Sequence, residues 1–290
     1  MSNMKKNYLF AFFAIFFWST TSTVSKFLLG SMTSFQTLCL GSFFAMTFFL
    51  LFNVSSKKQR MQLKAYKALD YAKMALIGAP GTFLYYVFFY TGTDLMPASQ
   101  ALIVNYLWPI CSVAFACVLL NERVTLRKIF AFLLSFFGII VVVGKDLVQF
   151  DLRILLGALS CVGAAFSYGL FTALNKKFRY DKNIFLMVSY TTSFLLTGLI
   201  AFFSSQLLEI GVIHVLGLVW NGVFAIAIAN LCWLQALEGA STAKISNLAY
   251  MTPFISLIWT SIFLHEAISA SAVIGLVIII GGILIQLKEK

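Results

Sequence analysis

The chain alternates long apolar segments with short charged ones along its whole length. A helix needs about 20 apolar residues to cross the roughly 30 Å hydrocarbon core of a bilayer, and many of the segments have that length. Only 11% of the 290 residues are charged, whereas a soluble domain has about 25%. The pattern therefore predicts an all-α integral membrane protein that crosses the bilayer many times.

We expect ten transmembrane helices. The first apolar segment follows Lys5 and Lys6, as a signal peptide would, but it continues to Leu29 without an evident small-residue cleavage site, so we expect it to be retained. The polar connection 53–71 is expected to lie along the membrane surface. The expected helices cover 8–29, 33–52, 72–92, 95–119, 126–144, 153–175, 183–204, 211–237, 240–264 and 269–287.

Lysines and arginines gather in every second connection. Most of the 21 lie near the chain ends or in 53–73, 120–128 and 176–182, whereas the alternate connections carry Lys145 and Arg153. Cytoplasmic loops are rich in these residues, so both termini are predicted to be cytoplasmic in a multi-pass protein of the inner membrane. These residues give the chain a net charge of +11. Because they lie in connections next to the membrane, we expect the lipid bilayer, and not nucleic acid, as a partner.

Two parts of the sequence resemble each other. The stretch "NYLWPICSVAFACVLLNERVT" is matched by "YMTPFISLIWTSIFLHEAIS", and the distance from Pro109 to Glu122 equals that from Pro253 to Glu266. Farther upstream, "FFWSTTSTVSK" resembles "AAFSYGLFTALNK". These similarities recur in the same order, which indicates that the chain is a duplication.

The duplication divides the chain into 1–146 and 147–290, each with five expected helices. Because five is odd, the second copy should be inserted upside down. The charges agree, because Glu122 is followed closely by basic residues and Glu266 has none before Lys288. Inverted repeats are typical of transporters that alternate between two conformations, with a binding site near the midplane where the repeats meet.

An amide, an aromatic residue and a proline recur in the fourth and ninth expected helices, as Asn105, Trp108 and Pro109 and as Asn247, Tyr250 and Pro253. A proline removes a backbone hydrogen bond and frees a carbonyl, which needs a partner in the protein or in a wet cavity. Tyr85, next to Tyr86 in the third expected helix, is a further candidate. The candidate substrate-binding residues are Trp18, Ser19, Lys26, Tyr86, Tyr90, Asn105, Tyr106, Trp108, Tyr168, Asn230, Trp233, Asn247 and Tyr250, with Pro80, Pro109 and Pro253 as helix-breaking positions.

Structural explanations compete with these assignments. The prolines could be packed kinks, the amides could join helices, and aromatics such as Trp220 and Trp259 are ordinary interfacial anchors. An intramembrane cation is a functional candidate because its burial is unfavourable. We interpret Lys26 as a carboxylate-attracting group at the outer mouth of a cavity, with snorkelling to the interface as the alternative. Lys244 is expected to snorkel.

None of the ten acidic residues and neither histidine lies in the middle of an expected span. A buried carboxylate or histidine relay is the usual sign of proton coupling. The sequence also has no phosphate-binding loop, metal-binding cluster or catalytic triad. We therefore expect no enzyme activity, cofactor or metal, and the five cysteines are expected to be free thiols. A facilitator, an exchanger and sodium coupling all stay open.

Small residues follow one another at four-residue spacing in the sixth expected helix, as Gly157, Cys161, Ala165 and Gly169. Such a stripe predicts close approach of another helix backbone. The expected helices 126–144 and 269–287 have almost no polar side chains in their centres. We assign these two to a scaffold or to contact with a second copy in a homodimer.

The arrangement resembles the drug/metabolite transporter superfamily, specifically its EamA type. Within it, "FWST", "NYLWP" and the "NK" that closes the sixth helix are similar to motifs of bacterial aromatic amino acid exporters. The resemblance implies a central cavity formed by the first, third, fourth, sixth, eighth and ninth helices. It also implies export, by alternating access, of phenylalanine, tyrosine, tryptophan or related neutral metabolites.

Two alternatives remain. Aromatic walls also serve cation–π contacts, which would suit a multidrug or cationic, choline-like substrate. The chain could instead be a membrane receptor that does not transport.

Overall fold

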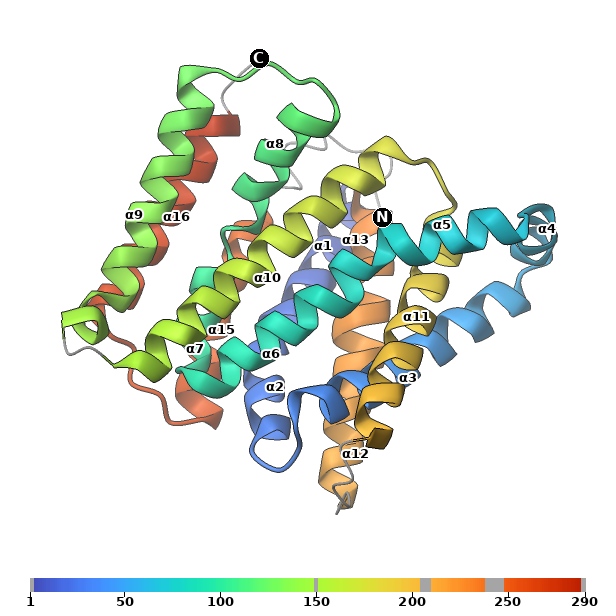
Figure 1. Ribbon diagram of the computed structural model, residues 1–290, viewed down its shortest axis with the longest axis horizontal. Coiled ribbons are helices and arrows are strands. Elements are labelled where there is room, and N and C mark those ends of the chain that lie inside the picture. Colours follow the sequence, from blue (N-terminus) through green and yellow to red (C-terminus); the bar gives the residue numbers. More distant parts are fainter. Residues whose placement is uncertain (1–2, 149–150, 204–209, 238–247, 288–290) are drawn as a thin grey trace.

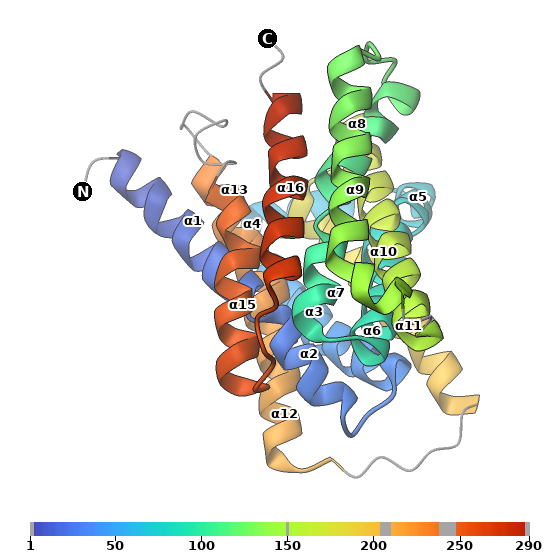
Figure 2. The same cartoon turned by 90° about the vertical axis from the view of Figure 1, so that its left-hand side faces the viewer.

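The computed structural model describes residues 3–148, 151–203, 210–237 and 248–287, and within these ranges the chain is helical without strands. Figures 1 and 2 show the bundle from two directions. The elements are α1 (Asn3–Ser19), α2 (Thr21–Leu29), α3 (Ser34–Ser55), α4 (Lys57–Ala65), α5 (Ala68–Ala79), η1 (Pro80–Leu84), α6 (Tyr85–Leu95), α7 (Ala98–Asn105), α8 (Trp108–Leu119), α9 (Leu126–Val148), α10 (Leu152–Lys177), α11 (Lys182–Phe203), α12 (Val212–Val219), η2 (Trp220–Ile228), α13 (Ala229–Leu237), η3 (Ala249–Met251), α15 (Thr252–Phe263) and α16 (Ala270–Leu287).

Consecutive elements combine into membrane-length helices, which confirms an all-helical multi-pass membrane protein. The described residues contain eight that are long and apolar enough to cross a bilayer: Lys5–Leu29, Ser34–Ser55, Ala68–Leu95, Ala98–Leu119, Leu126–Gly144, Leu152–Lys177, Lys182–Phe203 and Val212–Trp233. Two shorter apolar helices, Ala249–Phe263 and Ala270–Ile285, correspond to the last two expected ones. Residues 240–247 of the ninth expected helix lie outside the described residues.

Several of the membrane-length helices are interrupted by irregular segments. Pro80 begins the π-helical segment η1, and η2 is a second π-helical segment in the eighth membrane-length helix. Pro109 and Pro253 lie in the first turns of α8 and α15, where a missing backbone N–H leaves no partner unsatisfied. Just before α8 the backbone forms a tight turn, in which the amide of Leu107 donates to the carbonyl of Val104 at 3.2 Å. Pro80, Pro109 and Pro253 therefore lie where a helix changes its geometry.

The contacts between helices follow a symmetric scheme. α1 packs against α13 and α15. In the second half its counterpart α10 packs in the same way against α6 and α8. α3 lies along α11, and α9 runs beside α16 in the opposite direction (Figure 1). Each of these contacts joins a helix of the first half to one of the second half, and α3–α11 and α9–α16 join counterparts.

The same backbone turn ends α8 and α15. Asn121 and His265 both adopt the left-handed conformation, with φ of 54° and 56°, which these residue types tolerate better than most. The amide of Glu122 then donates to the carbonyl of Ala116 at 3.5 Å, and the amide of Glu266 donates to that of Thr260 at 3.3 Å. Each turn places a glutamate just beyond the end of a helix.

Small residues allow close helix packing where the sequence predicts it. A Cβ on Gly169 of α10 would lie 2.7 Å from the Cβ of Cys111 in α8, and one on Gly92 of α6 would lie 2.3 Å from the Sγ of Cys161. α9 and α16 also approach closely, since a Cβ on Gly138 would lie 2.9 Å from the carbonyl oxygen of Gly275. All five cysteines are free thiols.

Two opposite sides of the bundle can be defined from contacts between connections. On the basic side, Gln59 of α4 hydrogen-bonds Asp181 between α10 and α11, and Lys176 at the end of α10 hydrogen-bonds Glu122 between α8 and α9. On the opposite side, Glu266 between α15 and α16 binds Ser99 at the start of α7. In Figure 1 the basic side lies at the upper right and the opposite side at the lower left.

Candidate functional site

A cavity of about 300 Å³ lies between the two halves of the chain. Eight residues singled out from the sequence line it: Trp18, Tyr86, Asn105, Tyr106, Trp108, Tyr168, Asn230 and Trp233. Tyr85 lines it as well. The remaining lining residues are Thr21, Leu102, Phe171, Thr172, Asn175, Tyr190, Ala225, Ala249 and Thr252. The volume falls at the small end of the range typical of small-molecule sites.

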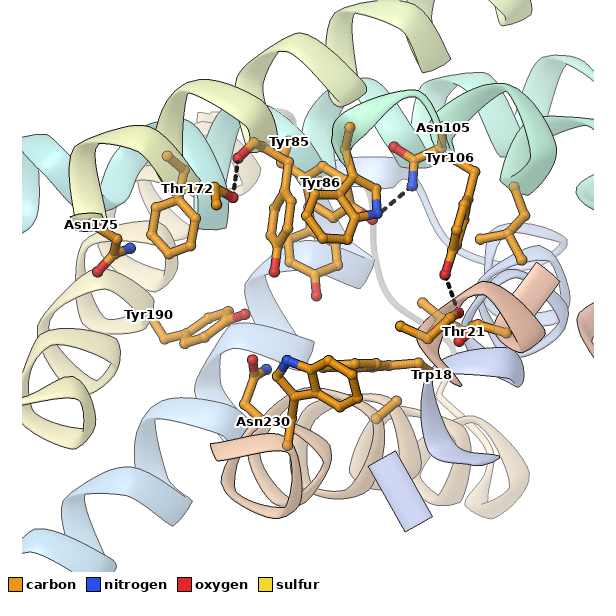
Figure 3. A pocket seen from close by; sticks show the side chains of 18 residues that line it. Trp18, Thr21, Tyr85, Tyr86, Asn105, Tyr106, Thr172, Asn175, Tyr190 and Asn230 are labelled. Atoms are coloured by element: carbon orange, nitrogen blue, oxygen red, sulfur yellow. Dashed lines mark hydrogen bonds between the residues drawn. The ribbon is translucent and has the colours of Figure 1, made fainter. Parts of the chain in front are cut away.

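The cavity has aromatic walls on two sides. On one side the rings of Trp108 and Tyr168 meet edge to face with centroids 5.1 Å apart, and Tyr85 lies 5.0 Å from Tyr168. On the other side the indoles of Trp18 and Trp233 lie 5.3 Å apart. Figure 3 shows Trp18 and Asn230 facing Tyr85 and Tyr86 across the open space. Such walls can hold a flat apolar group from both faces.

The polar groups of the cavity are held by other parts of the protein. The Asn105 amide nitrogen donates to the Tyr85 hydroxyl at 3.1 Å, and the Asn230 amide nitrogen donates to the Ile226 carbonyl at 2.6 Å. The Tyr106 hydroxyl donates to the carbonyl of Ala249. The amide oxygen of Asn105 is buried and accepts no hydrogen bond within the described residues. An unsatisfied buried acceptor is unfavourable, so a ligand that donates to it would gain affinity.

No Asp, Glu, Lys, Arg or His is among the described residues that line the cavity. An isolated charge is unfavourable in such surroundings. The arrangement therefore suits a molecule without net charge. Within the described residues, no three His, Cys, Asp or Glu side chains lie close enough together to hold a metal ion.

Four candidates from the sequence lie away from the cavity lining, and a fifth, Asn247, lies outside the described residues. The hydroxyl of Ser19 accepts from the indole of Trp259 at 2.9 Å. Tyr90 is fully buried and accepts from Asn221 at 2.6 Å, and Tyr250 packs beside the core around α7 and α8. These contacts join helices.

The fourth of these is Lys26, which is not among the residues that line the cavity. Its ammonium group donates to the carbonyl oxygens of Thr93, Asp94 and Met96, at 2.5, 3.1 and 3.0 Å. These carbonyls belong to the last turn of α6 and the residue after it, where a cation is favourable. Lys26 thus joins α2 to the end of α6.

The cavity is closed toward the opposite side by hydrogen bonds between the halves. The hydroxyls of Ser22 and Ser256 lie 2.9 Å apart, and the indole of Trp220 donates to Thr20 at 2.9 Å. Beyond them, the carboxylate of Glu266 accepts from the amides of Ala98 and Ser99 at 2.7 and 2.9 Å. Toward the basic side the lining continues to Thr172 and Asn175, in the last turns of α10.

Glu122 makes different contacts from Glu266, its counterpart in the other half. Its carboxylate lies 2.7 Å from the ammonium of Lys176 and 3.6 Å from that of Lys128. The hydrogen bond from Lys176, with the charges of both lysines, holds the pKa of Glu122 below that of an ordinary glutamate, although burial acts the other way.

The comparisons with known proteins agree with this fold. The profile of the EamA-like transporter family matches residues 5–144 and 155–287. An uncharacterized transporter of Clostridium kluyveri is 23% identical over 296 residues, covering 99% of this chain and 94% of the relative. The aromatic amino acid exporter YddG of Ancylobacter novellus is 23% identical over 208 residues, covering 71% of this chain and 72% of the exporter. A solved crystal structure with 21% identity covers 99% of both chains with a TM-score of 0.70, which supports the fold.

Proposed function

This chain belongs to the EamA-like family of membrane transporters, and we propose that it carries small neutral amphipathic metabolites, foremost aromatic or other neutral amino acids, out of the cell. The observation that carries the proposal is the uncharged cavity with aromatic walls. The distant similarity to an aromatic amino acid exporter supports the same substrate class. Membership in a transporter family favours transport over the alternative of a receptor that does not transport.

The cavity offers suitable groups for each part of an aromatic amino acid. The ring would lie between the Trp18–Trp233 pair and the Trp108–Tyr168 pair. The ammonium group would donate to the free amide oxygen of Asn105. The zwitterion has no net charge, so hydroxyl and amide groups can solvate it without a fixed counter-ion. The substrate-binding roles of the other lining residues are part of this proposal.

We further propose alternating access between two inverted five-helix repeats, 1–146 and 147–290, with ten helices and both termini in the cytoplasm. Three findings support the repeats: the symmetric helix contacts, the matching turns at Asn121 and His265, and the separate matches of the family profile to each half. The lysines and arginines of the basic side support a cytoplasmic location for that side in the inner membrane. The structure would then be a conformation closed toward the outside.

A cationic or multidrug substrate is the second candidate. The indole and phenol rings of the Trp18–Trp233 and Trp108–Tyr168 pairs, which line the cavity, would favour a quaternary ammonium group through cation–π contacts. The absence of an acid from the described lining makes a net cation less favourable there than a neutral molecule.

A homodimer through α9 and α16 is also a proposal. Phe137 and Ile140 of α9 and Ile274 and Val277 of α16 are exposed, although the two helices pack tightly against each other. These apolar faces suit lipid or a second copy. Cysteines placed at these positions would cross-link in the membrane if a second copy covers the faces, and would not if lipid covers them.

Uptake into proteoliposomes tests the substrate class. Purified protein is reconstituted, and the entry of labelled tryptophan, phenylalanine and choline is measured against empty liposomes. The proposal predicts saturable flux of the two amino acids and none of choline. Flux of choline alone would favour the cationic alternative, and flux of none of them would contradict the proposed substrate class.

A further inference from the structure

A second cavity, of about 280 Å³, lies outside the substrate cavity, in a groove between α8 and α9. Its walls are formed by apolar side chains that include Ala114 and Val118 of α8 and Ile129 and Leu133 of α9. All four are exposed on the surface of the protein. The groove lies on helices of membrane-crossing length, so it faces the hydrocarbon of the bilayer.

One end of this groove carries a positive charge. Lys128 is among its lining residues, and its ammonium group lies 3.6 Å from the Sγ of Cys117, which also lines the groove. The same group donates to the carbonyl of Arg123 at 2.8 Å and lies 3.6 Å from the carboxylate of Glu122. The ammonium is thus held at the boundary between the apolar groove and the polar connection.

Two arginines flank that end. Arg123 precedes the lining residue Val124, and Arg127 precedes Lys128. Both are exposed, and within the described part of the chain neither forms an ion pair with an acid. Glu122, the acid next to Arg123 in the sequence, is already shared between Lys128 and Lys176. The end of the groove therefore has an excess of positive charge.

We propose that this groove binds one anionic phospholipid, with an acyl chain between α8 and α9 and the headgroup phosphate on Arg123 and Arg127. An acyl chain matches a groove with apolar walls. A guanidinium group binds a phosphate through paired hydrogen bonds, and anionic lipid is attracted to basic residues next to a membrane helix. The proposal depends on the location of the chain in a bilayer and not on the proposed cargo.

Native mass spectrometry of the full chain tests the proposal. The protein is incubated in detergent with phosphatidylglycerol or with phosphatidylcholine that has the same acyl chains. The wild type should retain one phosphatidylglycerol and much less phosphatidylcholine. Replacing both charges (Arg123→Gln with Arg127→Gln) should lower the retained phosphatidylglycerol roughly tenfold or more, because each basic residue contributes about 1 kcal/mol.

Filling the groove tests the acyl-chain part separately. Ala114→Trp places a large side chain in the groove and leaves the basic residues intact, and it should also abolish retention. Leu133→Trp does the same from the α9 wall if Ala114→Trp does not fold. The charge control is Arg60→Gln with Lys64→Gln on α4, which removes two basic residues of the same side and should retain lipid as the wild type does.

Four results would overturn the proposal. The two lipids could be retained equally, the double arginine variant could bind as the wild type does, or the groove-filling variants could retain the lipid. Efficient disulfide cross-linking between two copies through Ala114→Cys, in liposomes that contain phosphatidylglycerol, would show that a second chain covers the groove instead.

Discussion

The carboxylate of Glu266 accepts a hydrogen bond from the hydroxyl of Ser99 at 2.6 Å. The same carboxylate accepts from the backbone amides of Ala98 and Ser99, so it caps the N-terminus of α7 from the connection between α15 and α16. A negative charge is favourable at that end of a helix. Glu266 thus joins the second half of the chain to the first, on the side where the cavity is closed.

Glu266→Gln should weaken this closure. A hydrogen bond to a charged group contributes about 1.5–3 kcal/mol, so the population open to the outside should rise about tenfold or more. The measurement is the rate at which a membrane-impermeant maleimide labels Thr21→Cys from the external side, with the five native cysteines replaced by alanine.

The control for this variant is Asp151→Asn. Asp151 also caps a helix on the same side, but it accepts hydrogen bonds from its own helix α10, at Arg153 and Ile154. Its substitution should leave the labelling rate unchanged. Equal rates in the Glu266→Gln protein and the wild type would contradict the role of Glu266.

Lys26→Met separates closure from substrate binding. The Lys26 ammonium donates to three carbonyl oxygens around the end of α6. Because these bonds join α2 to α6, their loss should weaken the closure and increase external labelling of the cavity. The apparent affinity for an amino acid should stay as in the wild type. A selective loss of affinity for tryptophan over tryptophan amide would instead assign Lys26 to the substrate carboxylate.

Glu122 should make stability depend on pH. Its pKa is lowered in the folded protein, chiefly by the hydrogen bond from Lys176, so its contribution is present above the ordinary pKa of a glutamate. The contribution is lost as the pH falls through the lowered value. The ion pair is largely exposed, which limits its contribution to less than about 1 kcal/mol.

The measurement is the difference in melting temperature between the wild type and Glu122→Gln in detergent. The wild type should melt higher at neutral pH, and the difference should disappear under acidic conditions. A difference that is the same at both pH values would show that Glu122 acts through packing and not through its charge.

Two neighbouring glycines test the packing of α9 on α16. A Cβ on Gly282 would lie 2.4 Å from the Ser135 hydroxyl and 2.8 Å from the Ala131 carbonyl oxygen, whereas a Cβ on Gly281 would meet nothing within 4 Å. Overpacking typically costs about 1–3 kcal/mol. Gly282→Ala should therefore lower the melting temperature, and Gly281→Ala should leave it unchanged or raise it. Equal effects would contradict the close contact.

Much of this architecture could be predicted from the sequence, because helix length, loop charge and the positions of proline are local properties. The places where Pro109 and Pro253 interrupt the helices were predicted in this way. The π-helical geometry of η1 and η2 was not, since Pro80 marks a break without specifying its type, and nothing in the sequence around Trp220 distinguishes it from a regular helix.

The cavity was predictable only in part. Trp18, Asn105 and Trp108 stand out because polar or large aromatic groups are unusual in the middle of a span. Tyr190 and Asn175 were missed. The direction of Tyr190 depends on how α11 is rotated in the bundle, and Asn175 lies so close to the end of α10 that it resembles an interfacial residue. The sequence could not identify the partners of Lys26, because they are backbone carbonyls of a distant segment.

The most direct test of the cavity as the substrate path is tryptophan counterflow in proteoliposomes that contain equal amounts of Trp108→Ala, Asn105→Ala or wild-type protein. Phe202→Ala is the control, because Phe202 is an aromatic residue exposed on the surface of α11, 79% accessible. In both cavity variants the flux should fall about tenfold or more, on the scale of one aromatic or hydrogen-bonding contact. Wild-type flux in both cavity variants would contradict the assignment of this cavity as the path of the substrate.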